Sequence, residues 1–255
     1  MNKFSVCIEP VFEGMDDVEK IRKVNDLGFS AVEFWDPAEK DRRLVKNVCD
    51  ELGMSVAICT LEDPWGDVRL HAETSKYVDH FEKSLLSVKE LGCKKVILLS
   101  GEDDGLPHKK QVDRIIENLS AVGPIAEKEG VILCLEALNS KVDHPGYFLD
   151  SSILAFSIVK EVKNPNVKVL YDVYHMQIME GNIIDTIEKN IEFIGHFHSA
   201  GVPGRHEHYF GELNYPGILE ALDRLGNEEH FGLEYWPTMN NEISLKEVFA
   251  RLREH

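Results

Sequence analysis

The 255-residue sequence lacks a long apolar run, an excess of positive charge and a secretory leader pattern. No stretch approaches the roughly 20 apolar residues that a membrane span requires, so we expect no membrane role. Lys and Arg total 28 against 45 Asp and Glu, and the net charge of −17 disfavours nucleic acid as a partner. Because no basic segment followed by an apolar stretch opens the sequence, we expect a cytoplasmic protein.

Paired cysteine motifs and linkers are also missing. The five cysteines are an odd number without CxxC spacing, and most lie within or beside apolar runs, which predicts reduced core residues. No Ser/Pro-rich linker or change of composition divides the chain. Residues 1–255 are therefore predicted to form a single domain.

Short apolar runs alternate with longer segments of helical period. The predicted strands are 4–8, 31–35, 54–59, 95–99, 131–135, 167–171, 193–197 and 232–235. Amphipathic segments at 16–27, 39–52, 74–91, 111–129, 151–162, 183–190, 217–225 and 245–253 predict helices. Strands that alternate with helices imply a parallel sheet, and eight such units in this length predict a closed (β/α)8 TIM barrel.

The joints between helices and strands support this fold class. Gly28, Gly53, Gly92 and Gly130 each follow a helical segment, where a left-handed cap is needed. The long connections, at 61–71, 139–148 and 199–214, follow the third, fifth and seventh strands. In a barrel of this kind they lie on the catalytic face.

The fifth to eighth predicted strands each lead into an ionisable residue: Glu136, Asp172, His198 and Glu234. In a barrel the C-terminal ends of the strands point to one mouth, where three carboxylates and an imidazole would repel unless a cation lay among them. Oxygen-rich ligation with one imidazole favours Mn²⁺, Mg²⁺ or Co²⁺, with Zn²⁺ as the alternative. Taken singly, such a residue is more often a helix cap, a salt-bridge partner or a solvated loop position, and the equivalent position on four successive strands is what favours a metal site.

Several segments, CLEALN, YDVYHMQIMEG, IGHFHSA, GRHEHYFGELNYPGIL and GLEYWP, resemble the xylose-isomerase-like sugar isomerase and epimerase superfamily, in particular the hydroxypyruvate isomerase family. The likeness covers nearly the whole chain. It implies the same four metal ligands, with Glu136 and Glu234 as the proton-transfer pair. It also implies that His175 and Arg205 bind the substrate.

One position departs from that family. Hydroxypyruvate isomerases resemble one another in carrying an amide side chain at the position of His198, whereas tagatose and psicose 3-epimerases carry histidine there. The resemblance therefore implies a divalent-metal-dependent isomerase that interconverts a ketose or 2-keto compound and its aldose or aldehyde isomer through an enediolate. The substrate would be a small hydroxy-keto acid or short sugar, and a ketose 3-epimerase is the alternative.

Two further classes are alternatives: an endonuclease-IV-like DNA-repair hydrolase and a non-catalytic sugar-binding relative. The missing acid before Arg205, where Gly204 stands, and the net charge argue against the first. The presence of an ionisable residue at all four strand ends argues against a non-catalytic sugar-binding protein. A homo-oligomer is compatible with the sequence.

Four other polar residues have open roles. Glu33 is placed either to reach the barrel mouth or to support a neighbour's hydrogen bonds. For His206 and His208 a solvated loop is favoured over metal ligation. Glu212 is a candidate support for the region of the eighth strand.

Overall fold

The structure, a computed structural model, describes residues 3–253 and contains one closed barrel of eight parallel strands. Strand β1 (Lys3–Cys7) pairs with β8 (His230–Leu233), which closes the ring. The other strands are β2 (Ala31–Phe34), β3 (Ser55–Thr60), β4 (Lys95–Leu99), β5 (Ile132–Glu136), β6 (Val167–Asp172) and β7 (Ile194–Ser199). The predicted (β/α)8 fold is confirmed, with strand ends that differ from the prediction by at most two residues.

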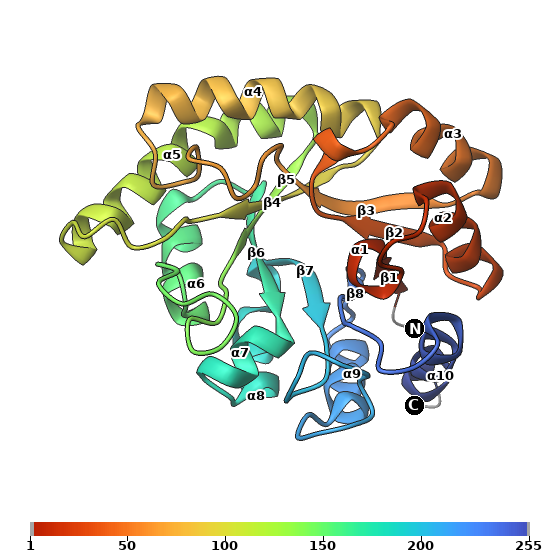
Figure 1. Cartoon of the computed structure of the whole chain (residues 1–255). Helices are drawn as coiled ribbons and strands as arrows, with labels where there is room; N and C mark the ends of the chain where they lie inside the picture. Colours follow the sequence, from red (N-terminus) through yellow and green to blue (C-terminus); the bar gives the residue numbers. More distant parts are fainter. Residues whose placement is uncertain (1–2, 254–255) are drawn as a thin grey trace.

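Helices surround the strands, as Figure 1 shows. They are α1 (Ile8–Val11), α2 (Asp17–Asp26), α3 (Arg42–Leu52), α4 (Thr74–Glu90), α5 (His108–Glu129), α6 (Ser152–Val162), α7 (Val173–Met179), α8 (Ile183–Asn190), α9 (Tyr215–Arg224) and α10 (Asn241–Arg253), with 3₁₀ turns at Pro37–Glu39 and Ile191–Phe193. Within residues 3–253, no helix combines the length and apolar character needed to cross a membrane.

Helix α7 was not predicted, and it matters for the site. It begins directly after β6 without a connecting loop. The Asp172 carboxylate caps it by accepting hydrogen bonds from the backbone N–H groups of Tyr174 and His175. Helix α7 has only seven residues, and a segment this short does not show enough helical periodicity in the sequence to be distinguished from the strand before it.

The strands are buried because helices cover them outside and side chains fill the barrel inside. All four residues of β2 and the last four of β6 are buried. The pairing of β6 with β7 sets Asp172 opposite His198. The register of the sheet thereby brings these two polar strand ends to one level.

Two predictions about local structure are confirmed. Gly28, Gly53, Gly92 and Gly130 all have positive φ, between +66° and +92°, as the helix ends require. All five cysteines are free and buried.

Candidate active site

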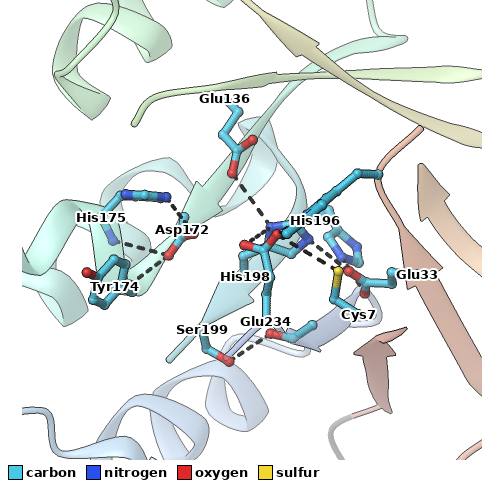
Figure 2. Close-up of polar contacts among 12 residues, drawn as sticks. Cys7, Glu33, Glu136, Asp172, Tyr174, His175, His196, His198, Ser199 and Glu234 are labelled. Carbon is cyan, nitrogen blue, oxygen red and sulfur yellow. Dashed lines mark hydrogen bonds and ion pairs between the residues drawn. The ribbon is translucent and has the colours of Figure 1, made fainter. Parts of the chain in front are cut away.

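The four strand-end residues converge at the C-terminal mouth of the barrel (Figure 2). His198 Nδ1 lies 3.6 Å from Glu136 Oε1 and 3.4 Å from Glu234 Oε2. Ligand atoms of Asp172, His198 and Glu234 all lie within 4.8 Å of one another, and all four side chains are buried. The structure thus brings together the residues predicted to bind a metal, while their ligand and catalytic roles stay predictions.

Hydrogen bonding shows that these residues fit a divalent cation. His198 Nε2 lies 2.8 Å from Glu33 Oε2, and because a carboxylate only accepts, Nε2 carries a proton. Nδ1 is then the nitrogen that faces the other carboxylates, where a cation would replace any proton on it. Among the described residues, His198 Nδ1 and Glu136 Oε1 are buried atoms without a hydrogen-bond partner. An imidazole lone pair beside carboxylate oxygens is a suitable donor set for a divalent metal.

His175 is held in the opposite tautomer. Its Nδ1 receives the side-chain N–H of Asn139 at 2.7 Å and the backbone N–H of the same residue at 3.2 Å. The imidazole proton is therefore on Nε2, which lies 3.5 Å from Asp172 Oδ2 and has no hydrogen-bond partner within residues 3–253. Although His175 lies within 4.8 Å of Glu136 and Asp172, it offers the site a donor rather than a metal-binding lone pair.

Both oxygens of the Glu234 carboxylate are engaged. Trp35 Nε1 donates to Oε1 at 2.6 Å, and the Arg205 guanidinium forms an ion pair with Oε2. The guanidinium lies 5.2 Å from the ring of Tyr174 and 5.1 Å from that of Trp236, so stacking fixes its plane. Burial raises the pKa of Glu234, but Arg205 and His198 outweigh it and hold that pKa well below its usual range.

The pKa values of the other two carboxyl groups, Glu136 and Asp172, are raised. Burial raises the pKa of Glu136, and burial raises the pKa of Asp172 to about 7. Burial lowers the pKa of His198, but Glu234 and Glu33 outweigh it and hold the pKa well above the ordinary value. A cation bound among these groups would take the place of protons, so metal affinity should increase with pH.

A cavity of about 130 Å³ opens beside these residues. Its lining combines Glu136, His175, Arg205 and Glu234 with Trp35, Trp65 and Trp236, among others. The three tryptophans thus line the cavity, a role that sequence alone did not separate from simple core packing. His144 stacks on Trp65 at 5.4 Å between ring centroids.

The loop after β7 corrects two expectations. His208 is buried rather than solvated, and His206 is half-buried, with its Nδ1 2.8 Å from the carbonyl oxygen of Trp236. Glu207 between them is buried too, and its carboxylate accepts hydrogen bonds from Thr238 and Ser244. The hydrogen bond from Ser244 connects this loop to α10. The run of polar residues in the sequence gave no sign of this contact. Glu212 is exposed, so it does not support the β8 region as suggested.

A closed parallel barrel with convergent carboxylates and histidines at its C-terminal mouth defines the class of barrel enzymes. Within that class, the family model described as xylose isomerase-like TIM barrel matches residues 21–255. The chain belongs to this family.

The chain is also similar to isomerases from other organisms and to one solved structure over nearly its whole length. The hydroxypyruvate isomerase of Escherichia coli (strain K12) is 28% identical, covering 96% of this chain and 98% of the relative. A 2-oxo-tetronate isomerase of Pectobacterium atrosepticum is 27% identical, covering 96% of each chain. A crystal structure named AP endonuclease, family 2, from Brucella melitensis is 29% identical, with a TM-score of 0.92 over 99% of this chain and 100% of that one.

Proposed function

We propose that this chain is a divalent-metal-dependent isomerase that interconverts a small hydroxy-keto acid and its aldehyde isomer. The observation that carries the proposal is the pair of buried, unpartnered atoms Glu136 Oε1 and His198 Nδ1, 3.6 Å apart. They lie beside a cavity that His175 and Arg205 also line. The relatives named after hydroxypyruvate and 2-oxo-tetronate support a short substrate with a carboxylate.

Metal ligation follows from the donor set. Glu136, Asp172, His198 and Glu234 would hold the ion, and three carboxylates with one imidazole suit Mn²⁺, Mg²⁺ or Co²⁺, with Zn²⁺ as the alternative. When bound, such an ion supplies Lewis acidity that stabilises the negative charge of an enediolate.

The proton transfers are assigned to side chains of this protein. Glu136 removes the proton from the carbon that bears the hydroxyl group, and the electron pair left behind forms the enediolate. Return of that proton to the former carbonyl carbon, with a proton passing between the two oxygens, completes the isomerisation. His175 Nε2–H donates to a substrate oxygen, and Arg205 holds the substrate carboxylate.

A 3-epimerase is the second candidate, favoured by His198. Epimerisation requires proton transfer on both faces of one carbon. Glu136 has an unpartnered oxygen, whereas both oxygens of Glu234 are committed to Trp35 and Arg205. This asymmetry favours isomerisation, in which a single carboxylate carries the proton, with Glu234 acting chiefly as ligand.

DNA-repair hydrolysis is disfavoured by charge and size. A net charge of −17 opposes a polyanion, and a cavity of about 130 Å³ suits a small molecule. The crystal structure from Brucella melitensis carries an endonuclease name, so the test includes that activity.

The test is a panel of short α-hydroxy ketones and aldehydes, with and without a carboxylate, incubated in D₂O with Mn²⁺ or Mg²⁺. The expected result is deuterium incorporation and isomer formation, strongest with carboxylate substrates and abolished by a chelator. Stereochemical inversion at one carbon instead would favour the epimerase. Cleavage of an abasic duplex without any C–H exchange would overturn the proposal.

A further inference from the structure

We infer that Glu33 is a positioning residue that sets the tautomer of His198 and thereby turns the Nδ1 lone pair of that histidine toward the metal-binding carboxylates. The inference rests on the proposed metal-dependent function. Glu33 lies on β2 and is 1% exposed. Its Oε2 lies 2.8 Å from His198 Nε2, and its Oε1 lies 2.8 Å from His196 Nε2 (Figure 2).

Small residues on β1 and β8 leave the space that the contact between Glu33 and the β7 histidines needs. Glu33 is on β2 and both histidines are on β7, so β1 and β8 lie between them in the ring. Ser5 on β1 pairs with Gly232 on β8, and both side chains are small. A Cβ atom on Gly232 would lie 2.7 Å from Glu33 Oε1 and 2.8 Å from His198 Cδ2. Glu33 therefore reaches across the barrel through space that a larger residue at 232 would fill.

Hydrogen-bond chemistry then determines where the protons are. Glu33 receives three donors, from Ser5 Oγ, His196 Nε2 and His198 Nε2, and a carboxylate can only accept. Each imidazole must present an N–H to it. For His198 this fixes a proton on Nε2 and turns Nδ1 toward the other carboxylates, 3.4 Å from Glu234 Oε2 and 3.6 Å from Glu136 Oε1. A bound cation would take the place of any proton on Nδ1. A carboxylate that orients a ligating histidine in this way tunes metal affinity without touching the ion.

A second cation among Glu33, His196 and His198 is the rival explanation, since their ligand atoms also lie within 4.8 Å of one another. The contacts argue against it. Each histidine meets a different oxygen of Glu33 at 2.8 Å, the length of a direct N–H···O hydrogen bond. The Ser5 hydroxyl occupies Oε1 as well. The number of bound ions separates the two explanations.

The experiment compares wild-type protein with Glu33→Gln, using ¹⁵N-histidine labelling and isothermal titration with Mn²⁺. In wild type saturated with Mg²⁺, long-range ¹H–¹⁵N correlation is expected to show a proton on Nε2 of His198 and none on Nδ1, and titration of the metal-free protein is expected to show one Mn²⁺ per chain. A glutamine amide can donate as well as accept, so the variant should populate the Nδ1–H tautomer. Its Mn²⁺ affinity should fall about 10- to 100-fold.

Ser5→Ala is the matched control, because it removes a donor from the same carboxylate and leaves the contact with His198. Its tautomer and Mn²⁺ affinity should match those of wild type. Unchanged tautomer and affinity in Glu33→Gln would overturn the inference, as would two Mn²⁺ per wild-type chain. An Nδ1–H signal for His198 in Mg²⁺-saturated wild type overturns it even if the variant fails to fold.

These readouts use no substrate, which separates the two proposals. A wild-type protein that binds one Mn²⁺ with the expected tautomer, yet exchanges no substrate C–H, would refute the isomerase and leave the role of Glu33 standing.

Discussion

Asn139 donates its side-chain N–H to Nδ1 of His175 across 2.7 Å, and this contact decides which histidine can bind a metal. It leaves His175 with a proton on Nε2, whereas Glu33 holds the Nε2 proton of His198 and leaves Nδ1 to face the other carboxylates. One site thus holds a hydrogen-bond donor and a metal-binding lone pair on the same type of side chain. Residue identity alone could not separate these roles.

The first prediction concerns the double variant Asn139→Asp/Asp143→Asn. Asn139 Nδ2 also donates to Asp143 Oδ2 at 2.6 Å, so exchanging the two residues keeps that hydrogen bond and avoids two facing carboxylates. His175 would then have to donate from Nδ1, and its Nε2 would become an acceptor. We expect kcat/KM to fall about 10- to 100-fold with unchanged Mn²⁺ affinity. Steady-state kinetics and calorimetry measure both, and equal kinetics would contradict the assigned tautomer.

Glu136→Gln is expected to abolish exchange of the substrate C–H with solvent deuterium. The amide cannot accept the proton, and positioned acid–base groups typically contribute about 10²- to 10⁴-fold to a rate. Proton NMR in D₂O follows the exchange, and circular dichroism checks the fold. The control is Glu212→Gln, an exposed acid on the loop after β7, which should exchange as wild type does. Exchange at the wild-type rate in Glu136→Gln would refute its role.

Arg205→Lys is expected to raise KM about 10-fold for substrates with a carboxylate and to leave substrates without one nearly unchanged. Lysine lacks the planar fork that pairs with a carboxylate and the face that stacks on Trp236. Arg69→Lys is the matched control, because both arginine side chains are about 10% exposed (11% for Arg205 and 10% for Arg69), and Arg69 pairs with Glu102 instead. An equal effect on both substrate classes would argue against carboxylate binding by Arg205.

Metal removal should lower both activity and stability. Saturation with Mn²⁺ at about 100 times its Kd should add about 2.7 kcal/mol, because the ion binds the folded carboxylates and offsets their repulsion. For a chain of this size that corresponds to a rise in Tm of roughly 5–10 °C. Thermal unfolding with EDTA and with Mn²⁺ gives the difference. Identical Tm values would exclude metal binding at the folded site.

His208 makes stability depend on pH. Burial lowers the pKa of His208 from 6.5 to about 3. Between these values the unfolded chain holds a proton on this residue and the folded chain does not, so stability decreases as pH falls through this window. The contribution is about 1.4 kcal/mol per pH unit. His208→Gln should reduce that slope in urea unfolding between pH 6 and pH 4. An unchanged slope would show that His208 is not buried in its neutral form.

The alternation of strands and helices was readable from the sequence because each type of element has its own period and each helix end needs its own cap. Gly53 and Gly130 show this, since both occupy the left-handed helix ends that the pattern predicted. Helix α7 was missed because it is short and directly continues β6, and it carries His175. The buried His208 was predicted to be solvated because its burial comes from tertiary contacts with Tyr215 and Tyr235.

By itself the sequence determined the fold class and the four strand-end residues, since both depend on local periodicity and on the rule that parallel strands in a barrel end at one mouth. The tertiary structure alone decided the partners of those residues. Glu33 meets His198 across the barrel, and Trp35 meets Glu234, over sequence separations of 165 and 199 residues. Both contacts depend on ring closure, and the contact of Glu33 with His198 also needs the space beside Gly232, which no local pattern encodes.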